Sequence, residues 1–350
     1  MRLLPRIGST AGAALLVALA IGCGSDDGGD ESSPEGSGGG PPDQPVMIRM
    51  GWGIPAEEIK YVMMSNPEVA PNLGTWYDVE WQQFAGTALG VQGLAAGTLD
   101  CATVGGLSVA NGIDQGAEIV VLGEFIEERQ PNFSTAWMVR KDSGIETLED
   151  LAGKTVATSA VGGSTDYIQD SYIEQETGLK PGEDYKKVEV PFGQMQETLL
   201  SGRVDMGLFP QPFFGAIDAT GDVKSMFRLT DAIDPFVQLL NGCSKEFVED
   251  NAEAVEKFQE DWVTVAEWVL DPANRDAVID ASAEATKIPA KVLKGFLVTE
   301  DDFFRPERGA VSVEALQEEW DYFRERGGIE QDLTVTDYVS DLTVTDGGGG

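Results

Sequence analysis

The chain lacks histidine altogether. Ser-His-Asp and Cys-His nucleophilic sites, and zinc sites built on imidazole, are therefore impossible. Cysteine is almost as scarce, with three among 350 residues and none of the close spacings that bind a metal. An enzyme would have to work with carboxylates, lysine or tyrosine, and the abundant carboxylates single out no catalytic pair. We therefore expect a protein that is not an enzyme, with no catalytic residues, no metal and no cofactor.

Positive charge is also scarce. The chain has 24 Lys and Arg against 60 Asp and Glu, a formal net charge of −36. Such a surface repels phosphates, which excludes nucleic acid as a partner and disfavours an anionic lipid surface. The acidity fits the solvated surface of a halophile's protein and also an ordinary soluble exported protein, and composition does not separate the two.

The first 22 residues carry the pattern of an export signal. Arg2 and Arg6 precede an uncharged stretch, residues 7–22, that is too short to span a bilayer. The stretch ends in Ala-Ile-Gly-Cys at Cys23, which resembles a bacterial lipobox, in which the cysteine thiol receives a lipid. An ordinary signal peptide followed by an unrelated cysteine is the alternative. We expect a signal peptide over residues 1–22 and a protein anchored to the cell membrane only through a lipid on Cys23, facing the periplasm or the cell exterior.

Residues 24–45 are almost wholly Gly, Ser, Pro, Asp and Glu, a composition that cannot bury enough apolar surface to offset its ordering entropy. We expect residues 23–45 to be a disordered tether after the lipidated cysteine, and residues 341–350 to be a flexible tail. The remaining 300 or so residues are enough for two domains of medium size.

Strand-like and helical patterns alternate along this remainder. The first series runs from residue 46 to 122 and a second begins at residue 135, whereas the chain beyond residue 240 is helical. Such βαβ repetition predicts an α/β fold, with mostly parallel sheets flanked by helices and with C-terminal helices.

Three local patterns, in order, carry a family resemblance. They are Gly-Leu-Ala-Ala-Gly-Thr-Leu-Asp at residues 93–100, the segment 143–157 with Leu-Glu-Asp-Leu-Ala-Gly-Lys-Thr-Val-Ala, and Leu-Ser-Gly-Arg-Val-Asp at residues 200–205. Over residues 46–326 their order resembles that of the taurine-, alkanesulfonate- and nitrate-type substrate-binding proteins of ABC transporters. Their superfamily also includes the thiamine-pyrimidine precursor proteins.

The resemblance implies a two-lobed periplasmic-binding-protein fold of the type II kind. Lobe one would comprise residues 46–127 and 234–340, and lobe two residues 134–231. It implies a monomer that closes around a small molecule by hinge motion and delivers it to an ABC permease and ATPase. The returning strand would bring Cys243 near Cys101, where either a disulfide or two buried free thiols could form.

Ligands of open α/β sheets bind outside the carboxyl ends of the strands. In lobe one the loops at these ends supply Trp52, Gly53, Phe84, Thr87, Gly106, Leu107 and Ser108. Trp52 offers a flat apolar wall or else packs in the core. Thr87 leaves helix amides free for a ligand oxygen or else simply caps its helix. The family uses the loop that contains Ser108.

In lobe two the corresponding candidates are Gly163, Ser164, Thr165, Asp166, Phe192, Phe209 and Gln211. The loop before residue 164 directs hydroxyls and amides toward the positive end of a helix dipole, which suits a sulfonate or carboxylate. Alternatively, Ser164 is the helix N-cap and Asp166 interacts with the dipole, without any ligand. A carboxylate at Asp166 would repel a sulfonate.

The segment that leaves lobe one carries several glutamates but no arginine placed to hold an anion. Glu124 and Phe125, together with Trp52, could hold a cationic group. Alternatively, the glutamates form a solvated acidic face. The ligand would then be held by backbone amides, or would carry an amine, or would be largely neutral.

These observations favour an extracytoplasmic solute-binding lipoprotein of an ABC importer, with a sulfonate, carboxylate or amine-bearing solute. An accessory or sensor lipoprotein of the same fold is the alternative. A carboxylate-based enzyme is less favoured, because the enzyme branch of the resembled superfamily depends on histidine and a cysteine-rich segment that this chain lacks.

Overall fold

The computed structural model describes residues 40–84 and 86–345. The expected signal peptide, the lipid site at Cys23 and most of the expected tether lie outside these residues. A compact unit begins at Pro41 and holds all the helices and strands described below.

The first sheet has the strand order β2-β1-β3-β10-β4. Its strands are β1 (Val46–Trp52), β2 (Tyr77–Gln83), β3 (Cys101–Val104), β4 (Ile119–Glu128) and β10 (Phe236–Ser244). β1 pairs in parallel with β2 and β3, whereas β10 pairs antiparallel with β3 and with β4. Four strands therefore run in one direction, and the returning strand β10 runs against them.

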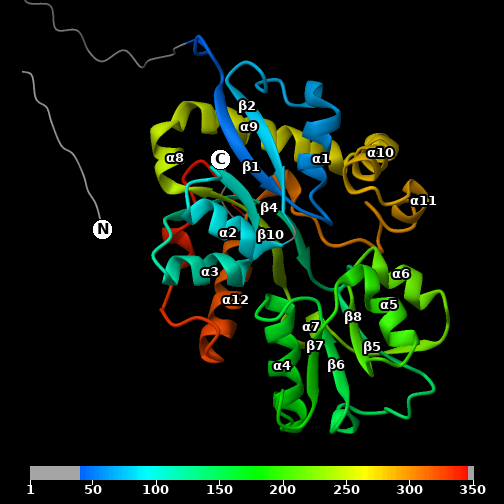
Figure 1. Cartoon of the computed structure of the whole chain (residues 1–350). Coiled ribbons are helices and arrows are strands. Elements are labelled where there is room, and N and C mark those ends of the chain that lie inside the picture. The colour runs from blue at the N-terminus through cyan, green and yellow to red at the C-terminus, as the bar shows by residue number, and fades with distance from the viewer. Residues whose placement is uncertain (1–39, 85, 346–350) are drawn as a thin grey trace, which may run out of the picture. The chain divides into compact units, whose positions relative to one another are not determined.

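The second sheet repeats this plan with the order β7-β6-β8-β5-β9. Its strands are β5 (Ala136–Arg140), β6 (Thr155–Thr158), β7 (Lys186–Glu189), β8 (Met206–Phe209) and β9 (Val223–Arg228). Here β5 is the strand that runs against the other four. The expectation of two mostly parallel sheets with helices around them is confirmed (Figure 1). We call the parts of the chain built around the two sheets lobe one and lobe two.

Helices cover both faces of the first sheet, as the nearly continuous burial of β3 and β4 requires. Ala102 and Val104 of β3 belong to one apolar cluster with α2 and α3, whereas Cys101 belongs to another with α9. The helices of lobe one are α1 (Glu58–Ser65), α2 (Thr87–Ala95), α3 (Gly106–Asp114), α8 (Lys245–Asp250), α9 (Ala252–Leu270), α10 (Arg275–Thr286), α11 (Ala290–Leu293) and α12 (Val313–Glu325). On α9, Trp262 and Val265 are buried, as a stripe with helical spacing predicts.

Lobe two has four α-helices, and short 3-10 turns connect several elements of the chain. The α-helices are α4 (Ser164–Thr177), α5 (Phe192–Leu200), α6 (Phe213–Asp218) and α7 (Leu229–Ala232). The 3-10 turns are η1 (Pro67–Val69), η2 (Leu148–Leu151), η3 (Pro272–Asn274), η4 (Glu307–Gly309) and η5 (Val335–Asp337). In the part of the chain that the structure describes, we find no helix with the length and apolar character that crossing a membrane requires.

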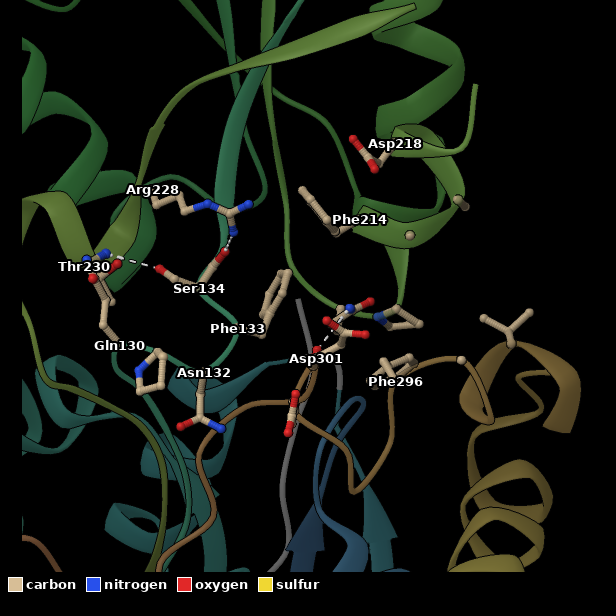
Figure 2. Close-up of a pocket in the computed structure, with 18 residues that line it drawn as sticks. Gln130, Asn132, Phe133, Ser134, Phe214, Asp218, Arg228, Thr230, Phe296 and Asp301 are labelled. Carbon is tan, nitrogen blue, oxygen red and sulfur yellow. Dashed lines mark hydrogen bonds between the residues drawn. The ribbon is translucent and has the colours of Figure 1, made fainter. Parts of the chain in front are cut away.

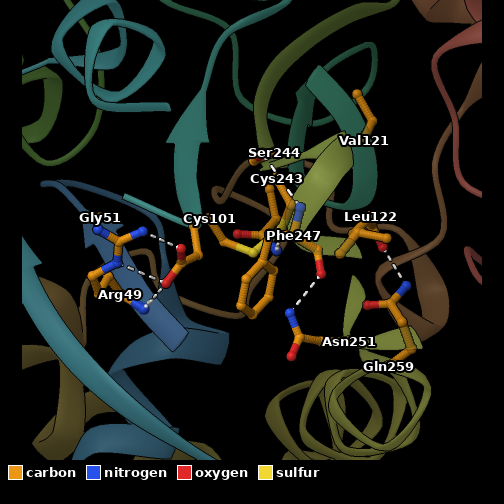
Figure 3. The surroundings of a disulfide bond; sticks show 12 residues. Arg49, Gly51, Cys101, Val121, Leu122, Cys243, Ser244, Phe247, Asn251 and Gln259 are labelled. Carbon is orange, nitrogen blue, oxygen red and sulfur yellow. Dashed lines mark hydrogen bonds and ion pairs between the residues drawn. A yellow bond between two sulfur atoms is a disulfide. The ribbon is translucent and has the colours of Figure 1, made fainter. Parts of the chain in front are cut away.

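A disulfide joins β3, which precedes lobe two in the sequence, to β10, which follows it. Cys101 of β3 and Cys243 of β10 lie opposite each other in the sheet and are bonded, at a sequence separation of 142 residues (Figure 3). The neighbouring Asp100 accepts hydrogen bonds from the backbone and side chain of Arg49 on β1. The returning strand is thereby tied covalently to the centre of the first sheet.

The end of the chain is bound to lobe one as far as residue 345. The backbone N–H of Val311 donates to the carbonyl of Val344 over 2.8 Å, and the Thr343 hydroxyl donates to the carbonyl of Val121 over 3.1 Å. One backbone bond and one side-chain bond thus hold Val344 and Thr343 against lobe one, and the flexibility of residues 341–350 stays a prediction.

Candidate functional site

The loop after β1 is filled by a buried ion pair of the chain itself. The Gly53 N–H donates to Glu57 Oε1 over 2.8 Å, and Lys60 Nζ lies 3.7 Å from Glu57 Oε2. Lys60 also donates to the Gly51 carbonyl and to the Thr103 hydroxyl. Burial raises the pKa of Glu57 and lowers the pKa of Lys60 to about 8, while their mutual attraction opposes both shifts. The N–H of Gly53, a residue predicted to line the ligand site, is therefore hydrogen-bonded to the carboxylate of Glu57, the N-cap residue of α1.

The aromatic side chains at the ends of β1 and β2 are only half-buried. The Trp52 ring packs edge-on against the Tyr61 ring at 6.0 Å. The Phe84 backbone N–H donates to the Trp52 carbonyl over 2.8 Å, so the two residues lie side by side. Part of the Trp52 side chain thus serves core packing, and both rings keep some exposure.

The loop after β3 also holds a carboxylate from the chain. Glu319 of α12 is fully buried and accepts hydrogen bonds from the backbone N–H groups of Val237 and Leu107. A Cβ atom on Gly106 would collide with this carboxylate, so the close approach requires glycine there. Burial raises the pKa of Glu319 well above its ordinary value, and the two amide hydrogen bonds oppose that shift.

Gly106 and Leu107 are therefore buried under α12, and their contact with a solute stays a prediction. Ser108 stays half-buried, with its hydroxyl 3.0 Å from the Thr87 hydroxyl. The carboxyl group of Glu319 thus lies at the start of α3, beside the loop that contains Ser108.

In the loop before α4 in lobe two, a carboxylate of the chain again accepts a hydrogen bond from a loop amide. Asp166 Oδ2 accepts the Gly162 N–H over 2.8 Å, and the carboxylate lies 3.0 Å from Lys187 Nζ. Lys187 also contacts Asp170 at 2.6 Å. Burial works to lower the pKa of Lys187, but its hydrogen bonds to the two carboxylates outweigh this and raise it. Because Asp166 is paired with Lys187, its charge is balanced inside the protein.

The helix N-cap in this loop is Gly163, since α4 begins at Ser164 and no side chain caps it. The alternative in which Ser164 is the N-cap is therefore wrong. Gly163, Ser164 and Thr165 are half-buried.

The expected cation cradle of Glu124, Phe125 and Trp52 does not form. Glu124 is fully buried and accepts the Ser312 N–H over 2.9 Å. The Phe125 ring is buried against the Trp262 ring at 4.9 Å, with Lys60 Nζ 5.1 Å from its centre. Successive residues of a strand point to opposite faces of the sheet, so Glu124 and Phe125 cannot share one binding surface. The alternative of a solvated acidic face is also wrong, because the side chains of Glu124, Glu127 and Glu128 are all fully buried.

The three remaining candidates follow or precede strands of lobe two. Phe209 is fully buried, and its packing on a solute stays a prediction. Phe192 is half-buried and stacks on Phe213 at 5.6 Å. Gln211 is buried, and its Nε2 lies 3.4 Å from the carbonyl oxygen of Asp301 in lobe one. Of these residues, Gln211 touches both lobes.

A cavity of about 880 Å³ lies beside Gln211, between the two lobes (Figure 2). Its walls come from the segment between β4 and β5, from α6 and the residues before it, from the end of β9 with α7, and from α11 with the segment after it. The lining residues are Gln130, Pro131, Asn132, Phe133, Ser134, Gln211, Pro212, Phe214, Gly215, Ala216, Asp218, Arg228, Thr230, Val292, Gly295, Phe296, Glu300 and Asp301. A concave site with aromatic walls and a few polar groups is the usual form of a small-molecule site.

Arg228 brings a cationic group to this cavity. Its Nη1 donates to the Ser134 carbonyl over 2.8 Å, and its guanidinium lies 5.2 Å from the centre of the Phe214 ring. Three carboxylates, those of Asp218, Glu300 and Asp301, stand on other walls and are exposed. In the part of the chain that the structure describes, none of these four charged groups has an ion-pair partner within 4.0 Å; the ion pairs found there involve other side chains.

The connection between the lobes passes beneath the cavity. Glu128, at the end of β4, accepts the Thr135 N–H over 2.6 Å and the Thr135 hydroxyl over 2.7 Å, and the Ser134 hydroxyl also donates to it. Burial raises the pKa of Glu128 to about 7, against the effect of these hydrogen bonds and of Arg228. The Thr230 N–H on the returning connection donates to Ser134 Oγ over 3.1 Å. The two connections are therefore hydrogen-bonded to each other.

Sequence reasoning missed the residues that shape the cavity, namely Arg228, Phe133, Phe214 and Phe296. Arg228 ends β9 and stands where the chain starts back toward lobe one. A lone arginine at such a position, in so acidic a chain, was the available signal. No comparable signal marked the phenylalanines, because each looks like an ordinary core residue in the sequence. Among residues 40–84 and 86–345, no cluster of three acidic, cysteine or histidine side chains could hold a metal ion.

Solved structures of low sequence identity share this fold. The aliphatic sulphonate-binding protein SsuA of Escherichia coli is 20% identical with a TM-score of 0.67, covering 87% of this chain and 95% of its own. SsuA of Xanthomonas axonopodis bound to MOPS is 16% identical with a TM-score of 0.66, covering 85% and 99%. The nitrate-binding protein NrtA of Synechocystis is 12% identical with a TM-score of 0.65, covering 85% and 87%.

A search of curated proteins found no match. The model of the family described as NMT1/THI5 like matches residues 77–272, which is more than half of the chain. The matched segment runs from β2 through all of lobe two and back into α9, so it includes both connections and most walls of the cavity. The chain therefore belongs to the NMT1/THI5-like family and has the periplasmic-binding-protein fold.

Proposed function

We propose that the protein is an extracytoplasmic solute-binding protein of an ABC importer. The observation that carries the proposal is the cavity of about 880 Å³ whose walls come from both lobes. Family membership and the fold shared with sulphonate- and nitrate-binding proteins support it. The protein acts by binding and release, so the solute leaves chemically unchanged.

The solute binds in this cavity, with Gln211 as the predicted residue that takes part directly. Trp52, Phe84, Thr87, Ser108, Ser164, Thr165 and Phe192 stand at or near the strand ends and remain partly exposed. These residues meet the solute only at its edge, because the nearby loop amides of Gly53, Leu107 and Gly162 are bonded to the chain's own carboxylates.

Hinge closure follows from a ligand that contacts both lobes. A solute between Phe214 of lobe two and Phe296 of lobe one stabilises the arrangement in which these walls are close. Lobe one would comprise residues 46–127 and 234–340, and lobe two residues 134–231. The closed form is what the permease and ATPase of the importer recognise. We further propose that the protein is a monomer and that a lipid on Cys23 holds it at the membrane.

A thermal-shift screen followed by small-angle scattering tests the function. The purified protein is screened against sulfonates, carboxylates, amines and amino acids, because a true ligand raises the melting temperature by mass action. We expect at least one solute to stabilise the protein saturably, to decrease its radius of gyration and to be recovered unchanged. If no solute in any class stabilises the protein, or if saturating ligand leaves the radius of gyration unchanged, the proposal of closure around a solute is wrong.

A further inference from the structure

We infer that the solute is a small zwitterion with an apolar or aromatic body, such as an amino acid with a large apolar side chain. This inference rests on the proposed function, since it names the kind of solute that the cavity between the lobes accepts. It follows from three features of the cavity: one cationic group, a set of carboxylates and a cluster of phenylalanine rings.

The anionic end of the solute is assigned to Arg228. One of the five guanidinium donors goes to the Ser134 carbonyl, and no carboxylate lies within 4.0 Å among the described residues. Glu128 is close enough to influence Arg228, yet its oxygens are engaged by Thr135 and Ser134. An arginine with unpaired donors at a cavity is suited to two parallel hydrogen bonds to a carboxylate or sulfonate.

The strand-end loops offer no equal site for an anion. The carboxylates of Glu57, Glu319 and Asp166 already accept amide hydrogen bonds in three of these loops. Glu319 is fully buried at the start of α3, and a solute anion there would have to displace its carboxyl group from the Val237 and Leu107 N–H groups. Arg228 is therefore the better partner for the anionic end.

The cationic end is assigned to the acidic walls. Glu300 and Asp301 follow α11 in lobe one, and Asp218 ends α6 in lobe two. Three carboxylates against one guanidinium give the cavity a net negative charge, which attracts a cation and disfavours a simple anion. A molecule with both charges satisfies both kinds of wall.

The body of the solute is assigned to the phenylalanine cluster. Phe133 packs edge-on against Phe214 at 5.3 Å, and Phe296 faces the cavity from lobe one (Figure 2). These rings favour an apolar or aromatic group, which gains from burial and from ring contacts. A short polar zwitterion would leave the cluster uncovered and would bind more weakly.

Three probes that share a phenyl ring on a short carbon chain but carry different charged groups test the inference by calorimetric titration of the full-length protein. L-Phenylalanine carries both charges, 3-phenylpropionate lacks the ammonium group, and 2-phenylethylamine lacks the carboxylate. We expect L-phenylalanine to bind at least about 30-fold more tightly than either of the other two, and glycine to bind at least about 10-fold more weakly than L-phenylalanine.

Two variants locate the binding. Arg228→Gln should reduce the affinity for L-phenylalanine by about 30-fold and leave the affinity for 2-phenylethylamine nearly unchanged. Arg203→Gln is the matched control, because Arg203 is exposed in lobe two and pairs with Glu197 away from the cavity; it should change neither affinity. Circular dichroism melting of both variants confirms that they fold.

The outcomes separate this inference from the proposed function. Equal binding of 3-phenylpropionate and L-phenylalanine, or equal affinities for the parent and Arg228→Gln, would overturn the zwitterion assignment. If the zwitterions fail to bind while another solute class stabilises and closes the protein, the inference is wrong and the proposed function stands. If no solute of any class binds, the proposed function fails with it.

Discussion

The charged groups of the strand-end loops have partners within the chain, whereas those around the cavity between the lobes have no ion-pair partner among the described residues. At the loops, Glu57, Glu319 and Asp166 place carboxylates on backbone amides that could otherwise hold a solute. Around the cavity, Arg228 and three carboxylates have no ion-pair partner within 4.0 Å among the described residues. The difference shows that a favourable anion site in a fold need not be a ligand site, because the chain can fill it.

Both arrangements follow from ordinary electrostatics. A helix start or a group of free amides stabilises any carboxylate that reaches it, and a side chain already in place loses no translational freedom on binding. A guanidinium beside an open cavity, in contrast, can exchange water for a solute anion. The loops therefore contribute to stability, whereas the cavity is the proposed site of recognition.

The largest effect on stability is expected from breaking the buried ion pair between Glu57 and Lys60 in the loop after β1. Lys60→Met leaves Glu57 buried without its cation, and we expect a loss of about 3–5 kcal/mol in the free energy of unfolding. Urea denaturation with linear extrapolation measures it. The double variant Glu57→Gln/Lys60→Met should recover most of the loss. A decrease below about 1 kcal/mol in Lys60→Met would show that the loop is not held by this pair.

A pH effect is expected at the connection beneath the cavity. The pKa of Glu128 is about 7 in the folded protein, against an ordinary value of 4.5, so the folded state binds this proton more tightly than the unfolded state. The resulting stabilisation is fully present below pH 4.5 and is lost as the pH rises through 7, by about 3 kcal/mol in total.

The difference in unfolding free energy between the parent protein and Glu128→Gln, followed from pH 4 to 8, isolates this contribution. Relative to the variant, the parent should lose stability as the pH rises. A flat difference curve would mean that Glu128 titrates near its ordinary value.

Removing the cation of the cavity should weaken binding without unfolding the protein. For the tightest solute of the thermal-shift screen, Arg228→Gln should lower the affinity by about 30-fold, or about 2 kcal/mol. Arg203→Gln provides the comparison, and its affinity should match that of the parent. Calorimetric titration measures both, and equal affinities for the two variants would contradict the assignment of Arg228.

A smaller loss is expected from the aromatic wall. Phe214→Ala removes a half-buried ring that faces the solute, and we expect a decrease in affinity of about 10-fold, or about 1.4 kcal/mol. Phe192→Ala in the same lobe is the comparison, because Phe192 stacks on Phe213, does not line the cavity and meets the solute only at its edge, so its loss of affinity should be smaller. A larger loss of affinity in Phe192→Ala would move the site toward α5.

The smallest effect is expected at the loop after β3. Ser108→Ala removes a hydroxyl that lies 3.0 Å from Thr87 Oγ1. Because Glu319 already occupies the start of α3, the affinity should change by less than about 2-fold, or about 0.4 kcal/mol. Competition titration against the parent resolves such a difference. A 10-fold loss would place the solute at the strand ends after all.

Much of the fold could be predicted from local patterns. Strand alternation and glycine-containing turns marked both sheets, and the expected return strand does lie beside β3, where Cys243 faces Cys101. Such patterns succeed because the spacing of apolar residues within a strand or helix indicates which of its faces is buried. The site was predicted less well, because its residues come from segments far apart in the sequence.

Two residues show the physical reason. Glu319 lies on α12, over 200 residues after Leu107, whose N–H donates a hydrogen bond to it. No pattern near either residue in the sequence predicts this contact. Gln211, in contrast, follows β8 directly, and its position after a strand was enough to place it at the boundary between the lobes. Sequence patterns locate strand ends, whereas tertiary packing decides which of their donors remain available.

A crystal structure of the protein with its tightest solute tests the central claim most directly. The account predicts the solute between Phe214 and Phe296, with its anionic group bonded to Arg228 and with Glu319 still accepting the Val237 N–H. A solute anion bonded to the Leu107 N–H, with the Glu319 side chain displaced from the start of α3, would contradict it.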